Sequence, residues 1–210
     1  MFNPLPIVSV IDLGSDDAST LVYTLEVAGA EVDRASDRDS LMNADGVIIT
    51  GNTDVATAMA RLREASGDEI IERRLSGGRP VLGIGAGMQI MFDGVVKDGT
   101  AAVGLGQWPG VVRSISGSTV PESLAIEAGF NSTMFAGLNG KHFVFNNPLA
   151  VTEWTLEVYG AFQKPAVSYA VNGERFISSV ENGPLSAVQF HPERSGDAGV
   201  QLLRNWLGTL

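Results

Sequence analysis

The sequence predicts an α/β protein with a doubly wound, mainly parallel sheet and a β-rich insertion. As far as residue 92, short apolar runs alternate with segments of helical periodicity, the pattern of strands joined by crossover helices. From residue 108 to residue 180 the pattern changes to short β-rich runs separated by Gly, Pro and Asn turns. The chain has 210 residues, enough for one domain with a sizeable core, and it shows no repeat or linker.

The elements of the first half follow from the apolar pattern. Leu21, Val22 and Leu25 have helical spacing, and Gly29 ends the helix that they define. Continuous apolar runs bounded by Gly, Pro or Asn are typical of buried strands. We expect strands at residues 6–13, 31–34, 46–50 and 80–84, and helices at residues 18–28, 54–64 and 68–75, with a short helical stretch at residues 88–92.

The second half contains the insertion and the return of the chain to the main sheet. We expect strands at residues 111–115, 143–145, 166–171, 175–180 and 185–190, followed by a closing helix at residues 197–207. Gly51, Gly85 and His191 each come just after a predicted strand. Ligands of open α/β sheets bind outside the carboxyl ends of the strands, so these three positions are candidates for one site.

Composition excludes several classes of function. A net charge of −10 argues against nucleic-acid binding, although it fits both simple solubility and an acidic face for a basic partner. No apolar run approaches the roughly 18 residues of a membrane span, and no signal peptide is apparent, so we expect a cytoplasmic protein. The absence of cysteine excludes disulfides, zinc–thiolate sites and a cysteine nucleophile. With only two histidines, we expect neither a metal nor a cofactor.

Residues 80–89, with the sequence PVLGIGAGMQ, are the most informative segment. An apolar run ends in a Gly-rich turn and leads into a helical stretch, which is the layout of a nucleophile elbow. The apex of the elbow falls at Gly85, which has no side chain to present. An elbow apex has a strained backbone that costs about 1–3 kcal/mol for other residues and little for glycine. Gly85 therefore predicts a stable turn without a nucleophile.

A second segment, residues 187–196 with the sequence AVQFHPERSG, supplies a histidine and a carboxylate. Together the two segments resemble the class I (triad) glutamine amidotransferases, in which the elbow reads Gly-Ile-Cys-x-Gly-x-Gln and the base segment reads His-Pro-Glu. Within that family, the similarity is greatest to the glutaminase subunits of imidazole glycerol phosphate synthase. The resemblance covers nearly the whole chain and includes residues 104–110, GLGQWPG. It implies one glutamine amidotransferase type 1-like domain over residues 1–210.

The resemblance implies roles for the candidate catalytic residues. It places a thiol at position 85, the base at His191 and the carboxylate that orients this base at Glu193. In this chain the base and the carboxylate are present, and Gly85 stands at the position of the lost nucleophile. We do not expect Ser195 to replace the thiol, because it lies next to the base segment and not at the apex of the elbow.

The oxyanion turn also departs from the family. The Pro-Gly-Val-Gly turn of the family corresponds to Thr-Gly-Asn-Thr at residues 50–53, which keeps Gly51 and has Thr53 in place of the second glycine. A threonine makes a backbone conformation with positive φ harder to reach. The backbone N–H of Ala86 is expected to remain as an oxyanion donor.

The segment that holds the substrate differs as well. Where the family has His-Ser-Tyr, this chain has Asn146, Asn147 and Pro148, and proline has no N–H to donate. Gln89 keeps the identity that the family has at this position and is a candidate contact for a bound amino acid. A Gly-x-Gly-Asn turn of the family is also changed, at residues 14–17. We expect glutamine binding to be impaired.

These departures favour an inactive glutaminase homologue from histidine biosynthesis. The resemblance implies a partner, a (β/α)8-barrel cyclase, which such a subunit could still bind and stabilise while the cyclase uses free ammonia. Two alternatives remain open at this level. One is a hydrolase in which His191 activates a water molecule, and the other is a sensor that binds an amino acid without turnover.

Overall fold

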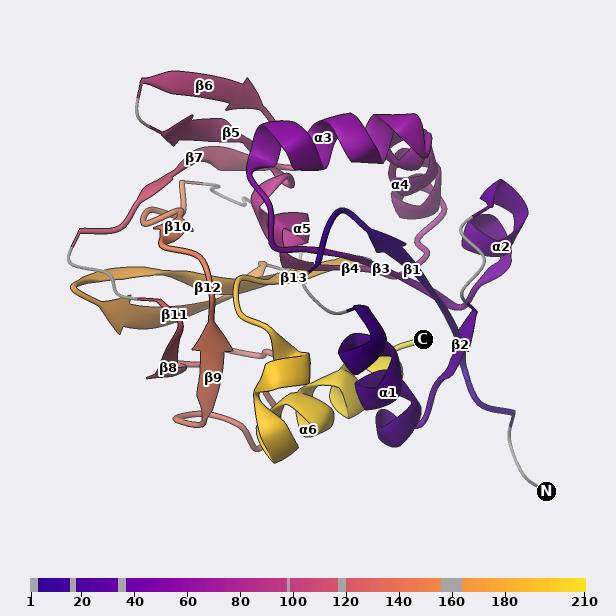
Figure 1. The fold of residues 1–210 in the computed structure, drawn as a ribbon. Helices are drawn as coiled ribbons and strands as arrows, with labels where there is room; N and C mark the ends of the chain where they lie inside the picture. The colour runs from indigo at the N-terminus through magenta and orange to yellow at the C-terminus, as the bar shows by residue number, and fades with distance from the viewer. Residues whose placement is uncertain (1–3, 16–17, 34–36, 98, 117–119, 156–163) are drawn as a thin grey trace.

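The fold is centred on a seven-stranded sheet that confirms the predicted doubly wound, mainly parallel architecture (Figure 1). The computed structural model describes residues 4–15, 18–33, 37–97, 99–116, 120–155 and 164–210. Five neighbouring strands run parallel: β2 (Glu31–Asp33), β1 (Ile7–Asp12), β3 (Gly46–Gly51), β4 (Val81–Gly85) and β13 (Leu185–Val188). Two antiparallel strands, β12 (Glu174–Asn182) and β11 (Ala166–Asn172), extend the sheet beyond β13.

Helices cover both faces of this sheet (Figure 1). On one face lie α3 (Val55–Glu64) and α4 (Gly67–Ser76), on the other α1 (Ala18–Ala28) and α6 (Gly196–Leu207), and the short α2 (Arg38–Asn43) lies near β2. Two separate apolar clusters fill the space between the layers. Val47 and Ile49 of β3 belong to one cluster and Ile48 to the other, because successive side chains of a strand point to opposite faces.

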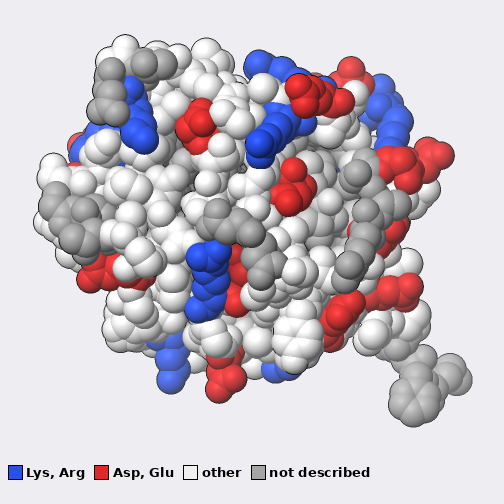
Figure 2. Space-filling model, viewed as in Figure 1, with Lys and Arg blue, Asp and Glu red and all other residues white. Residues whose placement is uncertain are grey.

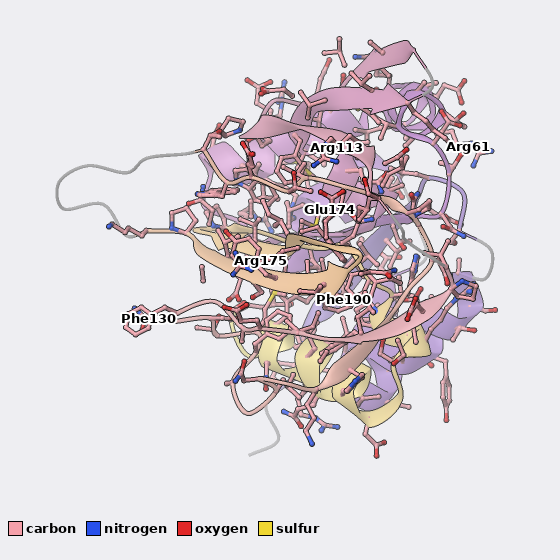
Figure 3. The ribbon with its side chains drawn as sticks, turned by 90° about the vertical axis from the view of Figure 1, so that its left-hand side faces the viewer. Arg61, Arg113, Phe130, Glu174, Arg175 and Phe190 are labelled. Carbon is pink, nitrogen blue, oxygen red and sulfur yellow. The ribbon has the colours of Figure 1, made fainter. Side chains whose placement is uncertain are left out.

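The β-rich insertion forms a second sheet and a hairpin. The sheet contains β10 (Leu149–Ala150), β7 (Trp108–Ser114), β5 (Phe92–Lys97) and β6 (Thr100–Val103) in this order, and the hairpin pairs β8 (Glu122–Ala125) with β9 (His142–Phe145). Arg113 of β7 donates two hydrogen bonds to the carboxylate of Glu174 in β12, so the pair links the second sheet to the main one (Figure 3).

The sequence-based bounds need one correction at the elbow. The predicted helical stretch at residues 88–92 is wrong, because helix α5 occupies Ala86–Gln89 and Phe92 begins strand β5. Phe92 pairs with Trp108 across the second sheet, and the two rings meet edge to face with centroids 5.6 Å apart. This long-range contact, which has no local signal, decides the end of the helix. The short elements α2, β5, β6, β8 and β10 were not predicted.

Charged side chains are mixed over the face shown in Figure 2. Acidic residues are scattered among basic and uncharged ones and do not gather into a single acidic field on this face. Within the described part of the chain, no helix combines the length and the apolar character that crossing a membrane requires.

Candidate functional site

The three candidate positions meet at the carboxyl ends of three neighbouring strands, β13, β4 and β3. The parallel register sets Gly51 opposite Gly85, and Val188 opposite Ile84. His191 follows Val188 by three residues and begins the turn that leads into the short helix η1 (Pro192–Arg194). Sheet topology therefore brings together segments that are more than a hundred residues apart in the sequence.

The apex of the elbow has the backbone conformation that the sequence predicts. Gly85 has φ 59° and ψ −115° and immediately precedes the first residue of α5. This region is strained for residues with a Cβ atom. Gly87, two residues further on, lies so close to β3 that an added Cβ would overlap the carbonyl oxygen of Ile49. The turn is thus sharp and tightly packed, as a nucleophile elbow requires.

His191 and Glu193 form a buried pair. The Nδ1 atom of His191 lies 2.8 Å from Oε1 of Glu193, and the two side chains are 3% and 6% exposed. When Nδ1 carries the proton that binds the carboxylate, Nε2 of the neutral ring is free to accept another proton. The second carboxylate oxygen of Glu193 is buried without a hydrogen-bond partner among the described residues. The pair has the geometry of a base and the group that orients it.

The free nitrogen of this base faces the empty apex. A Cβ atom built on Gly85 would lie 3.2 Å from both Nε2 and Cε1 of His191. The same atom would lie 2.7 Å from the carbonyl oxygen of Gly51, closer than such contacts occur in proteins. The structure therefore directs Nε2 of His191 at Gly85, and a backbone oxygen lies against the place that a side chain at residue 85 would take.

The oxyanion turn is fixed by backbone hydrogen bonds. The N–H of Asn52 donates to the carbonyl of Gly14 over 3.1 Å, which ties the turn to the loop after β1. The nearest group of the turn to the apex is the Gly51 carbonyl, an acceptor, whereas an oxyanion needs donors. Ala86 is the first residue of α5, so its N–H has no partner within that helix.

Asp54 stabilises the other end of this turn. Its carboxylate caps α3 by accepting hydrogen bonds from the backbone N–H of Thr57, at 3.0 Å, and from the Thr57 hydroxyl, at 2.7 Å. These bonds hold the pKa of Asp54 below its ordinary value. The turn at residues 51–54 is thus held by β1 on one side and by α3 on the other.

The candidate substrate residues converge on Leu149. Gln89 is fully buried, and its Nε2 donates to the Leu149 carbonyl over 3.1 Å. Asn147 accepts the N–H of Leu149 at its Oδ1 over 3.0 Å, and Asn146 is half-buried directly after β9. These bonds connect the elbow helix to β10. Contact of these residues with a substrate stays a prediction.

Ser195 and two aromatic rings hold the base segment in place. The Ser195 hydroxyl donates to the carbonyl of His191 at 2.7 Å and accepts the N–H of Val144 at 3.0 Å, in line with the expectation that it does not replace the thiol. Phe190 is fully buried and its ring centroid lies 4.3 Å from that of Phe143 (Figure 3). Sequence reasoning missed these contacts, because β9 is about fifty residues away and carries no motif that points to the base.

An apolar cavity of about 210 Å³ lies next to the oxyanion turn. Its lining residues are Asp54, Val55, Ala56, Val95, Lys97, Ala102 and Leu149. Within the described ranges, no group of three or more His, Cys, Asp or Glu side chains could hold a metal ion.

The sequence from residue 10 to residue 209 matches the family Glutamine amidotransferase class-I. The chain belongs to this family. Curated relatives include the imidazole glycerol phosphate synthase subunit HisH of Leifsonia xyli subsp. xyli, which is 49% identical over 97% of this chain and 98% of its own length. The proteins of the same name from Streptomyces avermitilis and Corynebacterium diphtheriae are 45% and 42% identical, each over 97% of this chain and over 96% and 99% of their own lengths.

Solved structures agree with the fold of this chain. A crystal structure of a glutamine amidotransferase superposes with a TM-score of 0.68 at 20% identity, covering 97% of this chain and 99% of its own. The structure of PurLQS from Thermotoga maritima has a TM-score of 0.70 at 18% identity and covers 98% of this chain and 99% of its own. The class I amidotransferase fold expected from the sequence is thereby confirmed.

Proposed function

We propose that this chain is a cytoplasmic amidotransferase subunit of an imidazole glycerol phosphate synthase that has lost glutaminase activity and serves to bind and stabilise the cyclase. The relatives with 42–49% identity over nearly their full lengths are named as HisH subunits of that synthase, which supports the pathway and the type of subunit. The loss of activity is argued from the site itself.

One observation carries the proposal of inactivity: Nε2 of His191 points at Gly85, which has no side chain. A Cβ atom built on Gly85 would lie 3.2 Å from Nε2 of His191, so a side chain at this position would be within reach of the imidazole. Glycine offers no group to deprotonate, and without a nucleophile no covalent intermediate with glutamine can form. The acceptor presented by Gly51 would oppose an oxyanion, which further favours the absence of turnover.

A glutaminase assay tests this part of the proposal. We expect no release of ammonia from glutamine above background, with or without the cyclase and its substrate. Glutamine analogues that alkylate thiols should leave the intact mass of the protein unchanged, because the chain contains no cysteine. Turnover in the ordinary enzyme range of roughly 1–10³ s⁻¹ would contradict the proposal.

The proposed docking surface is the rim of the site, at residues 14–17, 51–55 and 146–149. Residues 16 and 17 lie outside the described part of the chain. The first two segments are joined by the hydrogen bond from Asn52 to Gly14, and the cavity of about 210 Å³ opens between the second and the third. A stable complex buries roughly 1,200–2,000 Å² in total, enough to cover all three segments and the cavity.

Two matched substitutions on one helix test the docking surface. Ala56 is exposed, lines the cavity and lies in the first turn of α3, whereas Ala65 is exposed at the far end of that helix. We expect light scattering to show a one-to-one complex with the cyclase, which Ala56→Arg weakens at least tenfold and Ala65→Arg leaves intact. Charge reversal at Asp16 and Asp17 should slow association. A chain that stays monomeric with its cyclase at tens of micromolar would exclude the scaffold role.

The same geometry weighs against the two alternatives. A hydrolytic water between Gly85 and Nε2 of His191 would lie close to the Gly51 carbonyl, because a Cβ built on Gly85 is 3.2 Å from Nε2 and only 2.7 Å from that oxygen. An amino-acid sensor would need free polar groups, and the Nε2 atom of Gln89 and the Oδ1 atom of Asn147 are both used to hold Leu149. The Oε1 atom of Gln89 is buried without a hydrogen-bond partner among the described residues, so a ligand could still use this atom. If the cyclase does not bind, the sensor becomes the leading hypothesis, and calorimetry with glutamine tests it.

A further inference from the structure

Ser195 occupies a helix N-cap position and does not cap the helix. It directly precedes α6, where serine side chains usually accept an N–H from the first turn. Here the side chain makes no such bond. Instead the hydroxyl turns back toward the chain that precedes it, and a group that normally stabilises a helix end is used elsewhere.

The hydroxyl of Ser195 completes a three-bond connection between the base segment and β9. It donates to the carbonyl of His191 at 2.7 Å and accepts the N–H of Val144 at 3.0 Å. The carbonyl of Val144 in turn accepts the N–H of His191 at 2.9 Å. Both backbone groups of Val144 are therefore bound to the base segment. The N–H of His191 is bound by β9, and its carbonyl accepts the Ser195 hydroxyl and, at 3.1 Å, the N–H of Arg194.

We infer that Ser195 is a positioning residue for His191. It acts through the backbone of His191, since its hydroxyl bonds only backbone groups, and it thereby sets the direction in which the imidazole leaves the chain. That direction decides whether Nδ1 reaches Oε1 of Glu193, at 2.8 Å, while Nε2 faces the apex at residue 85. Because β9 continues directly into Asn146, the same connection fixes the base relative to the candidate substrate segment.

Packing around the connection agrees with this role. The ring of Phe190, the residue before His191, lies 4.3 Å from Phe143 and 5.5 Å from Phe145, the two residues that flank Val144 in β9. Apolar packing holds the two segments together, but it is not directional, whereas the bonds of Ser195 specify one register. The inference concerns the base alone and does not depend on whether the chain hydrolyses glutamine.

Nuclear magnetic resonance of the imidazoles tests this inference without any need for activity. The chain has two histidines, so protein labelled with ¹⁵N-histidine gives one set of ring-nitrogen signals from buried His191 and one from exposed His142. We expect the Nδ1–H of His191 to exchange slowly with solvent. Ser195→Ala should accelerate this exchange roughly tenfold or more, since two hydrogen bonds to the base segment are lost. Exposed His142 gives the reference for fast exchange, and Ser76→Ala, at an exposed position at the end of α4, is the matched control.

Two further variants separate positioning from helix capping. Ser195→Thr keeps the hydroxyl and should retain slow exchange. Ser195→Asp supplies a good N-cap acceptor but no donor for the His191 carbonyl, so it should behave like Ser195→Ala. If Ser195→Ala does not fold, Ser195→Cys, whose thiol bonds weakly, should give an intermediate exchange rate. Unchanged exchange in the Ala or Cys variant, or full recovery with Asp, would overturn the inference.

Discussion

Restoring a thiol at the apex is the sharpest perturbation that the structure offers. In Gly85→Cys, the new residue must adopt φ 59°, which L side chains rarely do, and its Cβ must push against the Gly51 carbonyl at 2.7 Å. The neighbour is backbone held in a sheet, so it cannot swing away as the end of a long side chain could. We therefore expect Gly85→Cys to fold with reduced stability.

The magnitude follows from three contributions. Backbone strain at such a position costs about 1–3 kcal/mol. Overpacking against fixed neighbours adds about 1–3 kcal/mol. Replacing glycine also reduces the freedom of the unfolded chain, which offsets about 0.4–1 kcal/mol. The net loss is about 1–6 kcal/mol with a central value of about 3 kcal/mol, and the central value lowers the melting temperature of a protein of this size by roughly 6–12 °C.

Calorimetry and urea unfolding of three variants measure these contributions. Gly85→Ala carries the same Cβ without the thiol and should lose nearly as much stability as Gly85→Cys. Gly183 has φ 60° with nothing within 4 Å of an added Cβ, so Gly183→Ala reports strain without crowding. We expect it to lose about 1–3 kcal/mol less than Gly85→Ala. An equal or higher unfolding midpoint for Gly85→Cys would refute an apex at residue 85. We also expect Gly85→Cys to hydrolyse glutamine more slowly than the ordinary enzyme range of roughly 1–10³ s⁻¹, because the Gly51 carbonyl and the Asn146–Asn147 segment are unchanged.

Two further predictions concern stability. The buried side chain of Arg74 donates to four backbone carbonyls. Arg74→Leu should therefore lower the free energy of unfolding by about 3–5 kcal/mol in urea titrations. Its control is Arg63→Leu at an exposed position of α3, which should change this free energy by less than about 0.5 kcal/mol. Asp54→Ala should cost about 0.5–1 kcal/mol at pH 7, a low value because the cap is exposed. The folded-state pKa of Asp54 is depressed, so this contribution is present above the ordinary value of 3.8 and is lost as the pH falls through the depressed one. Asp54→Asn keeps the cap and should lack this pH dependence.

Much of the central sheet could be read from the sequence, but only part of the insertion could. The strands expected at residues 111–115 and 143–145 correspond to β7 and β9, whereas β5, β6, β8 and β10 were not predicted. Strands β1, β3 and β4 are continuous apolar runs, and α1 has a regular helical period, so their local signals agree with their final structure. Strand β10 has two residues and β6 has four, too few for a periodic signal. Such strands form only when a partner strand is in place, which the neighbouring residues in the sequence do not encode.

The sequence by itself determined which groups the candidate site contains: an imidazole at His191, a carboxylate at Glu193 and no side chain at Gly85. It did so because elbow and base segments are short motifs whose geometry is largely local. The roles of these groups as base, orienting group and lost nucleophile stay predictions from the family resemblance. Only the tertiary structure decided that the Gly51 carbonyl lies against the position of a Cβ at Gly85, that Gln89 is bound to Leu149, and that the Ser195 hydroxyl bonds β9 and does not cap its own helix. Each of these contacts joins segments that lie 34 to 60 residues apart, and hydrogen bonds between such segments are set by sheet register and packing, which no single stretch of sequence specifies.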